Sequence, residues 1–254
     1  MSHEHIDRNS LFFKSLPAGF IVGEDAAQQR LLREYGAVFV AREGVVPPSK
    51  VVFRDDEDVS EFQTSLVIAE SQVGQFSLEL QSVAMDALLA AVAEAESVGL
   101  SITPRGADSA RRNYNDTIEL WKSRVEPALE HWTGKGRMTR GQADAIRSLS
   151  PYEQVPEIFS LEDEGIYFAK DLSKSIIYSV APPGASQHLS LLAFDVAEFD
   201  DAEVRRILAE HFWYQTVVSD LPHFTFLGIE ASKLPEIGLR QVISNEREFW
   251  IPEI

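Results

Sequence analysis

Cysteine is absent from the 254-residue sequence, and this absence excludes a disulfide framework, a Cys-ligated zinc ribbon, an iron–sulfur cluster and a thiol enzyme. Long hydrophobic runs are also missing. The longest candidate, an alanine-rich stretch at residues 83–93, is shorter than the roughly 18 apolar residues that a membrane span needs. A secretion signal has a charged region, then an apolar region and then small residues, and residues 1–14 do not follow this order. We therefore expect a soluble protein, cytoplasmic as the sequence is written, or extracytoplasmic if a signal was removed.

Basic residues are scarce relative to acidic ones. The sequence has 23 Lys and Arg against 40 Asp and Glu, which gives a formal net charge of −17. A field of this sign repels nucleic-acid phosphates and anionic lipid surfaces, whereas it attracts metal ions. We expect neither a nucleic-acid partner nor a membrane partner, and the composition leaves the oligomeric state open.

The spacing of apolar residues predicts both helices and short strands. Apolar residues recur at helical spacing over residues 114–132, so one face of a helix there must be buried. Gly99 follows a second helical segment and is expected to end it in a left-handed conformation. The other expected helices lie at residues 25–32, 139–146 and 201–212, and the second segment covers 81–98. The expected strands are residues 37–41, 51–53, 65–69, 100–103, 166–169, 175–180, 191–197, 215–218 and 224–227.

Helical segments dominate the first two-thirds of the chain and extended segments the last third. This distribution predicts an α+β fold class, with helices packed on one face of an antiparallel sheet. The acidic run at residues 55–58 is expected to be a solvated turn between strands.

Two of the six histidines stand out by their surroundings. His188 follows a Pro-Pro-Gly turn at residues 182–184 and precedes an expected strand in which Asp195 lies among apolar residues. A buried carboxylate loses its hydration, so it needs a cation or several hydrogen-bond donors. A divalent metal ion is one answer, and backbone amides are the structural alternative. The other four histidines lie in the N-terminal tail or near helix ends, where an imidazole is commonplace: His3, His5, His131 and His211.

His223 is the second candidate. Pro222 stiffens the backbone before it, so Asp220 and His223 are held in a fixed relation three residues apart. His188, Asp195 and His223 together offer two nitrogens and one oxygen, a set that suits zinc and leaves a fourth position for water. Asp220 would then act as the general base on that water. A histidine beside proline is equally compatible with a hydrogen-bonded structural role.

These segments resemble the zinc peptidase family of D-alanyl-D-alanine carboxypeptidases, dipeptidases and phage L-alanyl-D-glutamate endopeptidases. The family pattern is P-G-x-S-x-H, then A-x-D with the acid seven residues after the histidine, then an acid three residues before a final histidine. The sequence fills every position, with Pro183, Gly184, Ser186, His188, Ala193, Asp195, Asp220 and His223. The resemblance covers about residues 80–228 and implies a D-Ala-D-Ala peptidase-like fold, the fold shared with hedgehog proteins.

The sequence also departs from the family pattern. Asp220 stands where carboxypeptidase members have Glu, and the Asp-x-Pro-His-Phe form is more similar to the endolysin-type branch. Leu191 stands where the family usually has Gly. An upstream S-G-Y-R segment is replaced, and Arg105, in Ile102-Thr103-Pro104-Arg105, is identified as its arginine. These replacements leave the substrate class open.

The resemblance implies a role for each matched residue. His188, Asp195 and His223 would be the metal ligands for Zn²⁺, and Asp220 would be the catalytic base. Ser186 would contact the substrate or support a ligand, and Arg105 would bind a substrate carboxylate or the developing oxyanion, a catalytic as well as a substrate-binding role. An arginine after a strand is otherwise a surface charge, and a serine in such a turn has a purely local role as its alternative.

The sequence therefore predicts a zinc metallopeptidase acting on a short peptide, and the resemblance implies a peptide with D-amino acids as in cell-wall stems. The strong negative charge favours a small soluble peptide over an anionic wall polymer. The alternative is a non-catalytic module on the same fold that binds a peptide or partner. Residues 71–254 would form the catalytic domain, and residues 1–70 an N-terminal extension or added subdomain.

Overall fold

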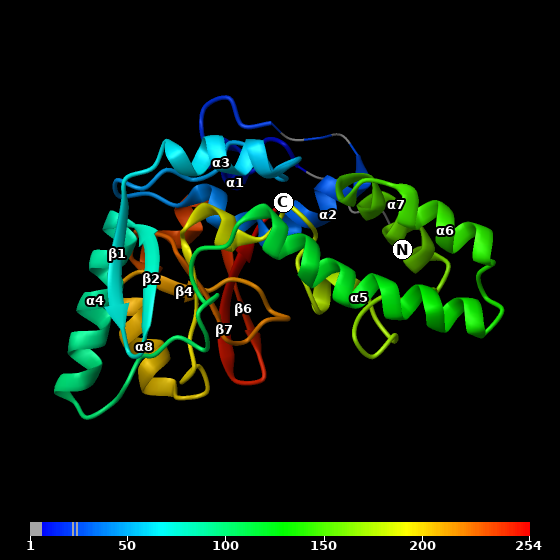
Figure 1. Cartoon of the computed structure of the whole chain (residues 1–254). Coiled ribbons are helices and arrows are strands. Elements are labelled where there is room, and N and C mark those ends of the chain that lie inside the picture. Colours follow the sequence, from blue (N-terminus) through cyan, green and yellow to red (C-terminus); the bar gives the residue numbers. More distant parts are fainter. Residues whose placement is uncertain (1–6, 22, 24) are drawn as a thin grey trace.

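A computed structural model describes residues 7–21, 23 and 25–254 of the chain. His3 and His5 lie outside the described residues. Helices and small antiparallel sheets alternate along the chain (Figure 1). The α-helices are α1 (Leu11–Ser15), α2 (Ala26–Tyr35), α3 (Asp56–Thr64), α4 (Ser82–Ser97), α5 (Tyr114–Gly134), α6 (Arg140–Ser148), α7 (Pro151–Asp163) and α8 (Ala202–Glu210). The 3₁₀ segments are η1 (Gly36–Val40), η2 (Ile176–Tyr178), η3 (Gln187–Ser190) and η4 (Ala231–Ile237).

The strands form three separate sheets within the described part of the chain. Strands β1 (Ile68–Val73) and β2 (Phe76–Gln81) make one hairpin, and β6 (Leu239–Ser244) and β7 (Arg247–Pro252) make another. Between them in sequence lie β3 (Ala193–Asp195), β4 (Trp213–Gln215) and β5 (His223–Phe226), which pair antiparallel in the order β3-β5-β4. The fold thus mixes helices with small antiparallel sheets, and the single expected sheet is replaced by three.

Local signals account for most of the helices. Asn113, Thr139 and Ser150 each form a capping box at the start of α5, α6 and α7. Gly99 follows α4 with a φ of 77°, as expected for a residue that ends a helix in the left-handed region. In Figure 1, α5, α6 and α7 lie together on one side of the molecule, and α4, α8 and the β1–β2 hairpin lie on the other.

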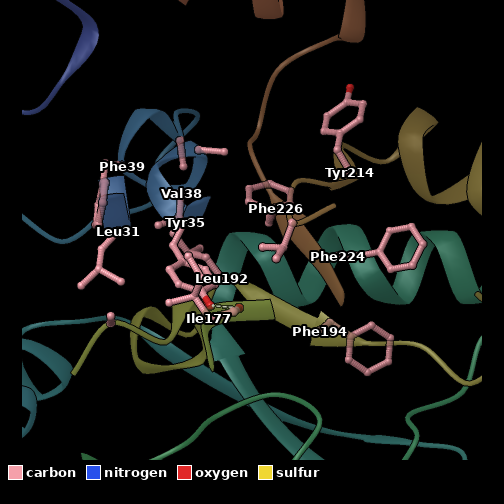
Figure 2. Close-up of a cluster of buried hydrophobic side chains, with 14 of the residues drawn as sticks. Leu31, Tyr35, Val38, Phe39, Ile177, Leu192, Phe194, Tyr214, Phe224 and Phe226 are labelled. Atoms are coloured by element: carbon pink, nitrogen blue, oxygen red, sulfur yellow. Dashed lines mark hydrogen bonds between the residues drawn. The ribbon is translucent and has the colours of Figure 1, made fainter. Parts of the chain in front are cut away.

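One hydrophobic cluster joins the N-terminal segment to the rest of the chain. Leu31 and Phe39 lie on one side of the side chains drawn in Figure 2, Phe194 and Phe224 lie on the other, and Phe226 lies between them. Strand β1 also runs across the expected boundary at residue 70. The division into residues 1–70 and 71–254 stays a prediction.

Several expected strands are absent for a physical reason. Residues 37–41 form a buried, continuously apolar run without alternation, and such a run does not distinguish a strand from a helical segment. The structure shows the 3₁₀ segment η1 there. Residues 51–53, 100–103 and 166–169 are not in strands either, and residues 175–180 contain η2.

The acidic run at residues 55–58 was wrongly expected to be a turn. The Asp55 carboxylate accepts a hydrogen bond from the Asp58 amide at 2.9 Å, so Asp55 is the N-cap of α3. The acids that follow lie in the first turn, where the helix dipole favours negative charge. Among the described residues, no helix has both the length and the apolar character needed to cross a membrane.

Candidate metal centre

Three local elements bring the predicted ligands together. His188 lies in η3, which follows the turn at residues 182–184, and Asp195 ends β3. His223 begins β5, and the antiparallel register of the two strands places it directly opposite Asp195. Residues directly opposite on neighbouring antiparallel strands have side chains within contact distance. Asp195 and His223, which are far apart in the sequence, therefore lie side by side because of the strand register.

Leu191 makes the connection between His188 and this strand. It ends η3 with a φ of 58°, in the left-handed region that glycine adopts without cost. Glycine is the residue that the zinc peptidase pattern has here. In this chain a leucine adopts the left-handed conformation, and its side chain is fully buried.

The ligand atoms of the three residues converge on one point. Nε2 of His188 lies 3.3 Å from Oδ1 of Asp195, and Nδ1 of His223 lies 3.2 Å from the same oxygen. One atom from each residue lies within 4.8 Å of the atoms from the other two. Both imidazoles are buried, and the Asp195 side chain is 15% exposed.

The other nitrogen of each imidazole faces an acceptor. Nδ1 of His188 lies 2.7 Å from the carbonyl oxygen of Ala110, and Nε2 of His223 lies 2.9 Å from Oε1 of Gln187. A carbonyl oxygen only accepts hydrogen bonds, so these two nitrogens carry the protons of the neutral rings. The Gln187 amide is oriented because its Nε2 donates to the backbone oxygen of Tyr35 at 2.8 Å.

This arrangement leaves lone pairs facing one another. In the neutral rings, Nε2 of His188 and Nδ1 of His223 both point a lone pair towards the carboxylate oxygen of Asp195. Three acceptors without a hydrogen between them repel, so the cluster needs either a metal ion or a proton on one of the imidazoles. The outward hydrogen bonds to carbonyl groups are those that commonly orient metal-ligating histidines.

The spacing also fits a small tetrahedral ion. Zinc binds nitrogen and oxygen ligands at about 2.0–2.1 Å, so two ligands of a tetrahedral zinc lie about 3.3–3.4 Å apart. The two measured nitrogen–oxygen distances, 3.3 and 3.2 Å, agree with that edge. Two of the three ligand–ligand distances in this cluster are therefore compatible with a tetrahedral zinc ion.

Electrostatics favour the ligand forms of these side chains. Burial lowers the pKa of His188, and the positive charge of Arg112 lowers it further, so the neutral imidazole is preferred. Burial acts to raise the pKa of Asp195, but the charge and hydrogen bonds of His188 and His223 in their protonated forms outweigh burial and hold this pKa well below its usual range. A neutral imidazole and an ionised carboxylate are the forms that bind metal.

Arg112 is the arginine that lies beside this centre. Its Nη2 is 3.1 Å from Oδ2 of Asp195, and its Nε donates to the backbone oxygen of Asp108 at 3.2 Å. Arg105, the arginine identified from sequence, is exposed and packs near the ring of Phe199. Both arginines line the cleft described below, but of the two only Arg112 contacts a predicted ligand through its side chain.

A cleft of about 420 Å³ opens onto the centre. All three predicted ligands line it, and so do the other predicted site residues: Arg105, Ser186 and Asp220. Ser186 is buried in the wall, whereas Asp220 is exposed. Within the described residues, the Asp220 carboxylate is not part of the three-residue cluster. The amide of His223 donates to the backbone oxygen of Asp220 at 3.2 Å, so the turn between the two residues is closed.

Two functional contacts were missed from sequence. Arg112 could have been found, because Ser109-Ala110-Arg111-Arg112 keeps the serine and arginine of the S-G-Y-R pattern at the right spacing. The contacts of Gln187 with His223 and with the backbone of Tyr35 had no local signal, because they join segments 36 and 152 residues apart.

Comparisons with known proteins add little to this geometry. No family model matches the chain, and no curated protein matches it. Among solved structures, the chain is similar to the vancomycin-resistance D,D-pentapeptidase VanY from a VanB-type resistance cassette, solved as a point mutant in complex with Zn(II). The TM-score is 0.39 at 17% identity, over 68% of this chain and 86% of that chain. Neither fold nor function is transferred at this level of similarity.

Proposed function

We propose that the chain is a zinc-dependent peptidase that cleaves a short peptide. One observation carries the proposal: two buried imidazoles and a carboxylate present converging acceptor atoms at zinc-like spacing, at the wall of a cleft large enough for a peptide. Three protein ligands leave a fourth position for water, which is the pattern of catalytic rather than structural zinc sites. The motif spacing in the sequence supports the same class.

The chain's own residues suit peptide hydrolysis. Zinc bound by His188, Asp195 and His223 would polarise a scissile carbonyl and lower the pKa of a water molecule. Asp220, at the cleft wall, would accept a proton from the attacking water and return it to the leaving amine. Its carboxylate is one methylene shorter than that of glutamate, so it must approach the water closely.

Arg112 and Arg105 would bind the negatively charged groups of the substrate. Two nitrogens of Arg112 are held by Asp195 and Asp108, which fixes the guanidinium plane at the cleft wall. A fixed guanidinium stabilises an oxyanion or binds a carboxylate through hydrogen bonds strengthened by charge. Arg105, exposed on the same wall, would assist in binding the carboxylate, and Ser186 would contact the peptide.

Short peptides that contain D-amino acids are the proposed substrate class. The experiment is hydrolysis of two panels by the zinc-loaded protein: peptides ending in D-alanyl-D-alanine, and peptides with an L-alanyl-D-glutamate bond. We expect turnover of one panel, and a loss of about 10²–10⁴-fold in kcat for Asp220→Asn with unchanged zinc content. Zinc binding without turnover of either panel, with Asp220→Glu equally inert, would instead support a non-catalytic peptide-binding module.

A further inference from the structure

Helix α5 contributes one wall of the cleft, away from the strand that carries Asp195. Thr117, Leu120 and Arg124 recur at spacings of three and four, so they share one face of the helix, and all three line the cleft. Tyr178 and Ser179, which lie at the end of η2, line the cleft as well. A polar and partly basic region thus lies within the cleft without contacting the metal ligands.

The guanidinium of Arg124 is fixed by serine hydroxyls. Its Nε donates to Oγ of Ser179 at 2.8 Å, and its Nη1 donates to Oγ of Ser123 at 2.8 Å. In the part of the chain that the structure describes, no carboxylate lies within 4.0 Å of this guanidinium, although the chain has 40 acidic residues. A half-buried guanidinium that is oriented by neutral groups keeps its charge available for an anionic ligand.

The helix gives an approximate separation between Arg124 and the segment that leads to His188. Oγ1 of Thr117 lies 3.4 Å from the amide nitrogen of Gly184, in the turn that leads to Ser186 and His188. Seven residues of helix separate Thr117 from Arg124, which corresponds to about 10 Å along the axis. An extended peptide advances about 3.3 Å per residue, so this separation corresponds to about three residues.

The direction of the peptide follows from the other arginines. Arg112 and Arg105 lie next to Asp195, and the amide of Arg105 donates to the backbone oxygen of Asp195 at 3.1 Å. If these arginines hold the carboxyl-terminal part of a peptide, its amino side extends along α5. Arg124 would then meet a side chain or linkage on the amino side of the scissile bond.

From this placement, we infer that Arg124 forms an anion-binding subsite that selects peptides with an acidic group about three residues before the scissile bond. The inference rests on the proposed peptidase function, and it specifies the substrate class. The competing role for Arg124 is structural, as a tie between α5 and the segment around Ser179. If Arg124 has only this structural role, its replacement changes the binding of all peptides equally. If Arg124 forms a subsite, its replacement weakens the binding of acidic peptides more than that of neutral ones.

The test compares two peptides that end in D-alanyl-D-alanine and carry either Glu or Gln at the third residue before the scissile bond. The full-length, zinc-loaded protein is compared with Arg124→Gln and with Lys122→Gln. Lys122 is an exposed cation on the same helix, outside the cleft, so its replacement makes the same charge change. For the wild type and Lys122→Gln, we expect the Glu peptide to have the lower KM by about tenfold. In Arg124→Gln this preference disappears, because the KM of the Glu peptide rises to that of the Gln peptide.

Binding of the same two peptides, measured by calorimetry, separates this inference from the proposed activity. If the wild type binds zinc and prefers the Glu peptide but hydrolyses neither, the peptidase proposal fails and the subsite stands. Arg124→Lys keeps the charge without the two serine contacts, so it should keep most of the preference. Equal weakening of both peptides in Arg124→Gln, or an unchanged preference, would overturn the inference. A wild type that binds both peptides equally would overturn it as well.

Discussion

Nε2 of His223 and Oε1 of Gln187 lie 2.9 Å apart, and this contact connects the metal centre to the N-terminal segment. The same amide donates from Nε2 to the backbone oxygen of Tyr35, the last residue of α2. Oγ1 of Thr225 also donates to Oε1 of Gln187. Gln187 therefore fixes the ring of His223 so that Nδ1 faces Asp195, and α2 fixes Gln187.

Replacing Gln187 tests this support. Gln187→Met keeps the approximate volume but removes the acceptor for His223 and the donor to Tyr35. We expect the zinc affinity to fall by about 10–100-fold, as is typical when a group that orients a ligand is lost. The measurement is a competition titration with a chelator of known affinity. Gln154→Met is the matched control, because Gln154 bridges Trp121 and Ile146, none of which lines the cleft. An equal fall in both variants would mean that general destabilisation is the cause.

Arg112 and Arg105 should differ in their effect on turnover. Arg112 is oriented by Asp195 within the cleft, whereas Arg105 is exposed beside Phe199. We expect Arg112→Met to lose about 10²–10³-fold in kcat/KM, because a fixed donor to the developing charge is removed. Arg105→Met should lose less than about tenfold, since an exposed ionic contact contributes little. A larger loss for Arg105→Met would restore the assignment made from sequence.

Gly184 is expected to tolerate no side chain. It adopts a φ of 77°, and a Cβ there would lie 1.9 Å from the backbone oxygen of Phe53. The left-handed conformation alone costs an alanine about 1–2 kcal/mol, and the overlap adds to this cost. Gly184→Ala should therefore lower the free energy of unfolding by more than about 2 kcal/mol in denaturant titrations. Gly165→Ala, with a φ of 80° and open space at the Cβ position, should lose only the conformational part. If the free energy of unfolding falls equally in the two variants, the close packing of Gly184 against Phe53 is contradicted.

Glu162 should make the stability depend on pH. Burial raises the pKa of this carboxyl above its ordinary value of 4.5, although the Ser175 hydroxyl, the Ile176 amide and Arg30 act to lower it. The folded state then holds the proton more tightly than the unfolded state. The free energy of unfolding should fall as the pH rises from about 4.5 through the folded pKa.

Glu162→Gln removes this titration, so its stability curve should be flatter over that pH window. Glu157→Gln, an exposed position on the same helix, should keep the slope of the wild type. Chemical denaturation at several pH values measures the difference. If the free energy of unfolding of Glu162→Gln changes with pH as steeply as that of the wild type, groups other than Glu162 cause the pH dependence.

Local signals were sufficient for several of the helices but not for the sheets. Periodicity and caps predicted α4, α5 and α6 because each is determined by neighbours within a few residues. The 3₁₀ segment η1 was mistaken for a strand, because its burial comes from distant packing rather than from its own pattern. Helix α7 and the β6–β7 hairpin were missed altogether.

The candidate site divides in the same way. The motif placed His188, Asp195 and His223 in one set, and the structure brings their ligand atoms together. Arg105 was identified from its place after an expected strand, and Arg112 was overlooked although its spacing from Ser109 fits the pattern. The contact of Arg112 with Asp195 depends on the fold. Gln187 and Tyr35 carried no chemical signal of their own, since their roles exist only where η3, β5 and α2 meet.

Zinc content is the most direct test of the metal centre. The purified wild type, His188→Ala and His211→Ala would each be equilibrated with zinc, dialysed and analysed for bound metal. His211 pairs with Glu94 at 2.9 Å on a different part of the molecule, so His211→Ala is a matched control. We predict about one zinc ion per chain in the wild type and in His211→Ala, and almost none in His188→Ala. Equal zinc content in all three proteins would contradict the proposed centre.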